Sequence, residues 1–154
     1  MKKKKTILIT LGIIALVVMH IFYPKTGSFD KLVLSEFPKA NINSIEISKG
    51  NGSIVNEYIN CDNNDKLNEF IAYIGDLNIV EYVGRRSVSD LEGYSILLDG
   101  IYNEEGTSKS MSLKVTIYNH DVIQISNGDE EERYYKIYNE HGFDIGHAMA
   151  ILGN

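Results

Sequence analysis

Tyrosine is the residue type in this sequence best suited to recognising another molecule. The chain has ten tyrosines and no tryptophan. Tyr118 falls on the polar side of an alternating stretch together with Lys114, and Tyr134 and Tyr135 lie in the last predicted strand. Amphipathic rings on an open sheet face can bind a ligand, and the same rings can instead pack across strands. We take Tyr118, Lys114, Tyr134 and Tyr135 as candidate ligand-binding residues.

The sequence holds few groups that could bind a metal. Beyond residue 23 the soft-metal ligands are Cys61, His120, His141 and His147, and their spacing matches no zinc pattern. His147 falls on the polar side of the final predicted helix, which favours a ring in solvent. We therefore expect no metal and no cofactor, and we expect the lone Cys61 to be buried.

Catalysis would need residues brought together from distant positions. The sequence contains no G-x-S-x-G motif and no glycine-rich phosphate-binding motif. One hypothesis is an envelope hydrolase in which His120, His141 and Asp144 converge in a pocket. The acidic runs at 104–105 and 129–132 lie at predicted turns, where solvated charge is the usual role. We therefore favour a protein that is not an enzyme.

Charge divides the chain into a basic start and an acidic body. Residues 1–23 hold four lysines (Lys2, Lys3, Lys4 and Lys5) and no acid. The other residues carry 11 Lys+Arg against 21 Asp+Glu, a net charge of −10 within a whole chain of −6. This body has one pair of adjacent basic residues, at 85–86, so we expect no nucleic-acid partner.

An apolar run of 17 residues, 7–23, follows the lysines. As a helix it would be about 25 Å long against a hydrocarbon core of roughly 30 Å, and flanking lysines can snorkel. Phe22 and Tyr23 fall where an interfacial aromatic belt would lie, and Pro24 ends the run. The sequence predicts a signal anchor that contacts the lipid bilayer through residues 6–23, with the lysines cytoplasmic and the body extracytoplasmic.

The alternative is a cleaved export signal, which would release a secreted binder or inhibitor. The small residues at 26–28 offer a cleavage site near Ser28, but bulky Phe22, Tyr23 and Pro24 precede it. We therefore prefer the uncleaved anchor at the cell membrane.

Apolar periodicity predicts the elements that must position these residues. A β-hairpin is predicted over 45–59, then a helix over 65–75 with Gly75 as its C-cap. Strands are predicted over 79–83, 94–101, 111–117, 122–125 and 134–138, and a final helix capped by Asp144 over 145–152. Apolar residues on both sides of the strand 94–101 predict that it is central and buried on both faces.

This order predicts an α+β fold with a mainly antiparallel sheet of about six or seven strands and two helices on one face. The N-terminal transmembrane helix would precede it. We divide the chain into a lysine cluster and signal anchor over 1–23, a juxtamembrane linker over 24–41, and an extracytoplasmic α+β domain over 42–154.

The lysine-rich start, the single apolar run and the Ile-, Asn-, Lys- and Tyr-rich body resemble small single-pass extracytoplasmic proteins of unknown function from low-GC Gram-positive bacteria. The resemblance covers the whole chain in composition and rests on no motif, so it assigns no site residues. It implies a membrane-tethered extracytoplasmic module. We expect a non-enzymatic binding module whose partner is a protein or a cell-envelope ligand.

Overall fold

The computed structural model describes residues 10, 12–13, 23–51, 54–82, 93–128 and 132–153. The strands of this part are β1 (Thr26–Ser28), β2 (Asn41–Asn51), β3 (Ile54–Cys61), β4 (Asn78–Glu81), β5 (Gly93–Glu104), β6 (Thr107–Tyr118), β7 (Val122–Asn127) and β8 (Arg133–Ile137). The helices that follow residue 23 are α2 (Phe29–Leu32), α3 (Asn64–Gly75) and α4 (Ile145–Gly153), and η1 (Leu34–Glu36) is a turn of 3-10 helix.

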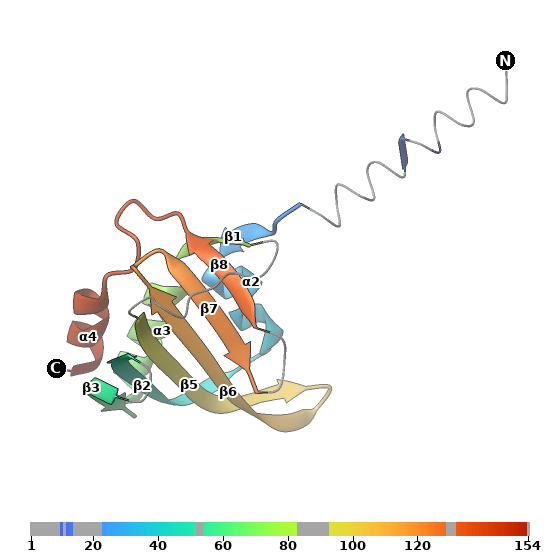
Figure 1. Ribbon diagram of the computed structural model, residues 1–154. Coiled ribbons are helices and arrows are strands. Elements are labelled where there is room, and N and C mark those ends of the chain that lie inside the picture. The colour runs from blue at the N-terminus through green and yellow to red at the C-terminus, as the bar shows by residue number, and fades with distance from the viewer. Residues whose placement is uncertain are drawn as a thin grey trace, which may run out of the picture.

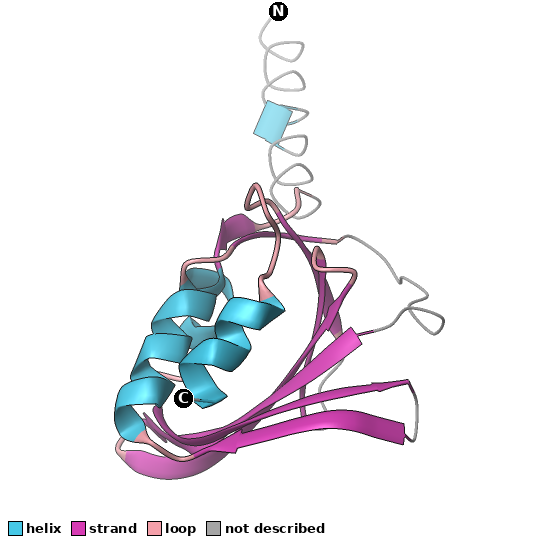
Figure 2. Ribbon diagram, turned by 90° about the vertical axis from the view of Figure 1, so that its left-hand side faces the viewer, coloured by secondary structure: helices cyan, strands magenta, loops and turns pink. Residues whose placement is uncertain are grey.

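The described strands form one antiparallel sheet of eight strands in the order β1-β4-β8-β7-β6-β5-β2-β3. The sheet curves around α2, α3 and α4, which lie on its concave face (Figures 1 and 2). The predicted α+β class and antiparallel sheet are confirmed. The strand that the sequence did not predict is β1, whose three residues are too few to show a period.

Local chemistry explains where the predicted helix begins and ends. The side-chain oxygen of Asn63 accepts hydrogen bonds from the backbone N–H groups of Asp65 at 3.0 Å and Lys66 at 3.3 Å, which caps α3. The prediction that Gly75 is the C-cap is wrong. Gly75 is the last helical residue, and Asp76 follows it in a right-handed conformation, so this helix end needs no left-handed glycine.

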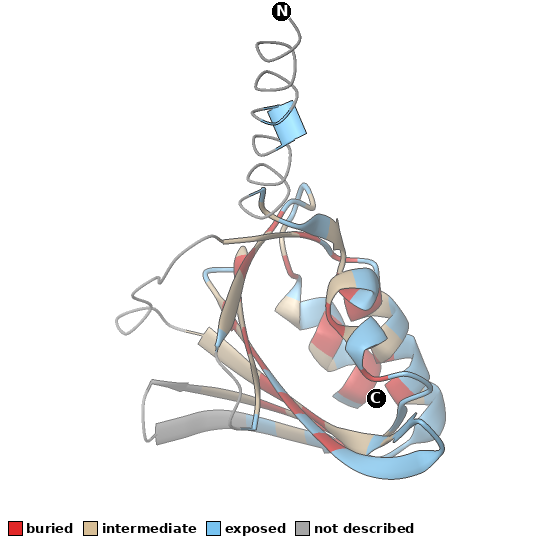
Figure 3. Cartoon of the chain, turned by 90° about the vertical axis from the view of Figure 1, so that its right-hand side faces the viewer, coloured by how far each residue is buried: buried red, intermediate tan, exposed pale blue. Residues whose placement is uncertain are grey.

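The core lies between the concave face and the helices, as the band of buried residues in Figure 3 shows. On β5, Ile96 and Leu98 point into it and are at most 1% exposed. Leu97 lies on the other face and is partly exposed, and Ile101 is 45% exposed. The prediction that this strand is buried on both faces is therefore wrong, because the described helices cover the concave face.

The segment expected to be a linker, 24–41, contributes to the fold from Thr26 onward. β1 pairs with β4, and Phe29, Val33 and Phe37 are buried in the core at 1%, 0% and 4% exposure. Glu36 also forms a two-pronged ion pair with Arg133 of β8, at 2.5 and 2.6 Å. Phe29, Val33 and Phe37 can all reach the core because they are spaced four residues apart, which places their side chains on one side of the α2–η1 segment.

Most of the predicted signal anchor lies outside the described residues, as does the predicted loop at 84–90. Within the described part of the chain, no helix is long and apolar enough to span a membrane. Cys61 is buried at 6% exposure, as predicted.

Candidate functional site

The convex face of the sheet carries three of the four candidate ligand-binding residues. Strand register places one row of polar side chains across five strands of this face: Ser48 of β2, Ser95 of β5, Thr116 of β6, Gln124 of β7 and Tyr134 of β8. Lys114 and Tyr118 lie on either side of Thr116 along β6, and side chains two apart on a strand share a face. We call these seven residues the outer row.

Tyr118 is held in place on this face. Its ring covers Gly93, its partner across β5 and β6, since a Cβ at Gly93 would lie 2.9 Å from the ring. Its hydroxyl donates to the side-chain oxygen of Gln124 at 2.7 Å. Partial burial raises the pKa of Tyr118, and the negative charge of Glu132 raises it further. The cross-strand packing that the sequence left open is therefore present here, and it fixes the ring in one orientation.

Tyr134 and Tyr135 face opposite ways. Tyr134 lies on the convex face, where its hydroxyl donates to the Glu132 carboxylate at 2.8 Å. Tyr135 points into the core and is 2% exposed, and this burial raises its pKa. Tyr135 is therefore not part of the outer row, because neighbouring residues of a strand point to opposite faces.

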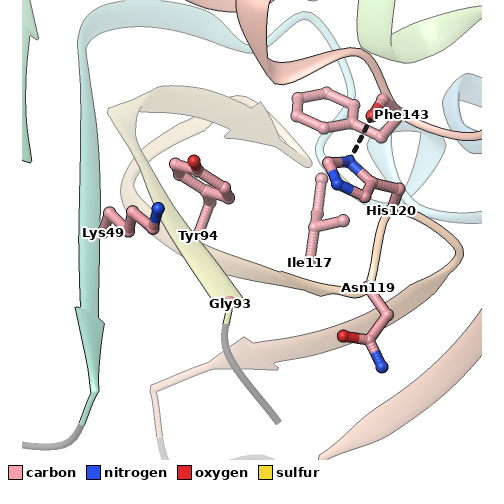
Figure 4. A pocket seen from close by; sticks show the side chains of 7 residues that line it. All are labelled: Lys49, Gly93, Tyr94, Ile117, Asn119, His120 and Phe143. Carbon is pink, nitrogen blue, oxygen red and sulfur yellow. Dashed lines mark hydrogen bonds between the residues drawn. The ribbon is translucent and has the colours of Figure 1, made fainter.

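The concave face ends in a small pocket of about 160 Å³. Its lining residues are Lys49, Gly93, Tyr94, Ile117, Asn119, His120 and Phe143 (Figure 4). Lys49, Tyr94 and Ile117 are successive partners across β2, β5 and β6, so one row of the sheet forms a wall. Asn119 and His120 come from the turn between β6 and β7, and Phe143 comes from the segment before α4.

Two hydrogen bonds fix the His120 side of this pocket. The backbone N–H of Phe143 donates to the carbonyl oxygen of His120 at 2.8 Å. The Nδ1 atom of His120 lies 3.2 Å from the carbonyl oxygen of Phe143 (Figure 4). A carbonyl can only accept, so Nδ1 carries the hydrogen in this contact, and Nε2 is left to interact with other groups.

The residues of the hydrolase hypothesis do not all line this pocket. His120 lines the pocket, whereas His141 and Asp144 are not among its lining residues. The Asp144 carboxylate instead accepts from the backbone N–H of His147 at 3.1 Å, so it caps α4 as predicted. His147 is exposed, as predicted, and its ring packs edge-on against Tyr73. In the described part of the chain, no three His, Cys, Asp or Glu side chains are grouped so that they could hold a metal ion.

Sequence reasoning missed Lys49, Tyr94 and Phe143 as pocket residues. A signal was present for the first two. Lys49 is in phase with buried Ile45 and Ile47, so a charged residue occurs at an inward-facing position of a strand. Tyr94 likewise precedes Ile96 in phase. The sequence carries no comparable signal for Phe143, because its place depends on how α4 packs.

Comparisons with known proteins identify no relative from which a site could be transferred. No family model matches the chain, and no curated protein matches it. Among solved structures, the chain is similar to a thioesterase-like protein from Clostridium sporogenes ATCC 15579, at 16% sequence identity and a TM-score of 0.39. That match covers 65% of this chain and 88% of the other. Similarity at this level carries no argument about activity.

Proposed function

We propose that the protein is a membrane-tethered, extracytoplasmic, non-enzymatic binding module that holds its ligand against the convex face of its sheet. The observation that carries this proposal is the outer row. It gathers hydroxyl, amide, ammonium and phenol groups from neighbouring strands on the face opposite the helices.

The chemistry of the outer row suits a neutral ligand that is rich in hydroxyl groups, such as a cell-envelope glycan. Ser48, Ser95, Thr116 and Gln124 can each donate and accept hydrogen bonds, and none of them carries a charge. The Tyr118 ring is already ordered by Gln124 and Gly93, so less side-chain entropy is lost when a ligand packs against it. Short side chains near the tyrosines leave a surface on which the C–H face of a sugar ring can lie.

The N-terminal segment supports the tethered form over the released one. Four lysines precede the apolar run 7–23, and β1 begins at Thr26. Cleavage at Ser28 would remove β1, which pairs with β4, and would also remove the hydroxyl that caps α2 through the backbone N–H of Lys31 at 3.2 Å. A membrane anchor so close to β1 would hold the domain beside the bilayer.

The binding proposal is tested with the full chain in lipid nanodiscs and cell-wall glycan stripped of anionic polymers. We expect the chain to co-sediment with the glycan. Tyr134→Ala removes a ring of the outer row, and Gln124→Ala removes the acceptor that orients Tyr118, so each should weaken binding at least fivefold. Tyr138→Ala is the matched control, because Tyr138 is 65% exposed but lies beyond the end of β8.

Two results would contradict the proposal. One is native chain that fails to co-sediment with the glycan; the other is equal binding by the Tyr134→Ala and Tyr138→Ala variants. The placement of the domain is tested separately, by a reporter fused after Asn154 that is active only outside the cytoplasm. An inactive fusion would overturn the extracytoplasmic location.

A further inference from the structure

We propose that the pocket at the end of the concave face is a second binding site, which takes a small organic carboxylate with a short apolar body. The site and the outer row lie on opposite faces of the sheet, so the two proposals can fail independently.

The charge of the pocket lining favours an anion. Among the lining residues that the structure describes, Lys49 carries a formal positive charge, and none is an aspartate or a glutamate. This composition contrasts with a chain whose net charge is −6. The Lys49 ammonium lies 5.3 Å from the centre of the Tyr94 ring, a cation–π contact that holds the charge against the pocket wall. A carboxylate entering the pocket would therefore meet a positioned cation.

The pocket also combines polar and apolar groups. Ile117 and Phe143 form the apolar part of the lining; both side chains pack into the core, at 3% and 1% exposure. The His120 imidazole brings a polar group from the adjoining turn, whereas the Asn119 amide of the same turn points away from the other labelled side chains (Figure 4). A ligand with one charged end and one apolar end can satisfy both kinds of surface, which an inorganic anion cannot.

The volume of the pocket limits the size of the ligand. The pocket volume of about 160 Å³ is close to that of an engineered apolar protein cavity of about 150 Å³ that binds benzene. The ligand should therefore be about the size of one substituted ring or a short branched acid. Benzoate is a suitable probe, and benzamide is its neutral control of nearly the same shape.

The site is rigid at the turn that carries His120. The two hydrogen bonds between His120 and Phe143 tie the β6–β7 turn to the segment before α4. The polar and apolar lining groups are therefore held at fixed positions before a ligand arrives, which lowers the entropy lost on binding.

Benzoate binding is measured by saturation-transfer NMR with the full chain in zwitterionic lipid nanodiscs. Empty nanodiscs are the blank. We expect benzoate to bind with a dissociation constant in the millimolar range, and benzamide to bind at least tenfold more weakly. Lys49→Gln should weaken benzoate binding at least fivefold, and Lys49→Arg should restore it. Lys114→Gln, on the other face of the sheet, should leave it unchanged.

A further variant changes affinity in the opposite direction. Glu57 is paired with Lys49 in the backbone register of β2 and β3, so Glu57→Gln removes a formal negative charge from the strand position opposite Lys49 and should strengthen benzoate binding. This result is informative even if Lys49→Gln fails to fold. Equal affinity for benzoate and benzamide, or benzoate binding that is insensitive to both Lys49→Gln and Glu57→Gln, would overturn the proposal.

Discussion

The turn between β6 and β7 is strained at the level of single residues. Asn119 and His120 have φ angles of 47° and 64°, the left-handed region that both central residues of a type I′ turn occupy. A residue with a Cβ adopts this conformation at a cost of about 1–2 kcal/mol, and asparagine and histidine are found there more often than most other residues. The two hydrogen bonds to Phe143, worth about 1 kcal/mol each, offset that cost. The strained turn and the segment that packs on it therefore stabilise each other.

Gly142→Ala should break this arrangement. Gly142 has a φ of 63°, and a Cβ atom there would overlap the carbonyl oxygen of His120. The turn would have to move, so we expect the free energy of unfolding to fall by about 2–4 kcal/mol in urea titrations. Gly106→Ala is the matched control: its φ is 83°, but nothing lies within 4 Å of the added atom. Gly106→Ala should lower the free energy of unfolding by about 1 kcal/mol, from backbone strain alone. Equal losses for both variants would show that the contact with His120 is unimportant.

At the scale of elements, Tyr73 of α3 holds the start of α4. The Tyr73 hydroxyl donates to the carbonyl oxygen of Asp144 at 3.1 Å and accepts from its backbone N–H at 2.9 Å. The Tyr73 ring also contacts Phe143 and His147, with ring centres 5.7 and 4.9 Å apart. Tyr73 thus holds the start of α4, and with it the Phe143 side of the pocket.

Tyr73→Phe should loosen α4 without unfolding the domain. The ring contacts remain, but both hydrogen bonds are lost, at a cost of about 1–2 kcal/mol in a partly buried site. Urea unfolding measures the loss, and amide hydrogen exchange should become faster in α4 while it stays unchanged in β6. The same change at Tyr102, whose ring makes an edge contact with Phe37, is the control. Protection of α4 that is unaltered in Tyr73→Phe would refute this role.

Some helices and strands could be predicted from the sequence, and others could not. The strand β6 was predictable because Met111, Leu113, Val115 and Ile117 alternate with polar residues along a face that the helices cover. The capped start of α3 was predictable from a run of asparagine and aspartate ahead of an apolar helical period. Such signals are local, so they locate an element and the direction in which its side chains point.

The parts that sequence reasoning missed depend on contacts between distant segments. β1 and α2 are too short for a period, and Phe29 becomes a core residue because α2 packs against α3 and β1 pairs with β4. The outer row was partly predictable, because Tyr118 and Lys114 lie in phase on one strand. The pocket could not be predicted, because its lining residues come from separate parts of the chain, including β2, β5, the β6–β7 turn and the segment before α4. Side chains alternate between the two faces along a strand. This alternation places Tyr118 on the convex face, and it also places Tyr135 in the core, so Tyr135 is not part of the outer row.

At the scale of the whole molecule, the tyrosines couple stability to alkaline pH. Burial raises the pKa of Tyr73, of Tyr118 and of Tyr135 above the ordinary value of 10.0. When the pH rises through about 10, the unfolded chain therefore loses these protons before the folded chain does. The unfolded state then binds fewer protons than the native state, so the free energy of unfolding decreases as pH rises. The stabilisation from these groups is complete well below pH 10 and is lost above it.

We therefore expect the urea midpoint to be steady from pH 7 to 9 and to fall between about pH 9.5 and 11. Tyr118→Phe combined with Tyr135→Phe should reduce the slope of that fall, because phenylalanine has no proton to lose in either state. Tyr138→Phe is the control, since Tyr138 is 65% exposed and its change should leave the slope as it is. Lysines also titrate in this range, so the comparison between the variants, and not the slope of the native chain, isolates the tyrosines. A double variant with the native slope would mean that the protons of Tyr118 and Tyr135 are equally stable in the folded and unfolded chains.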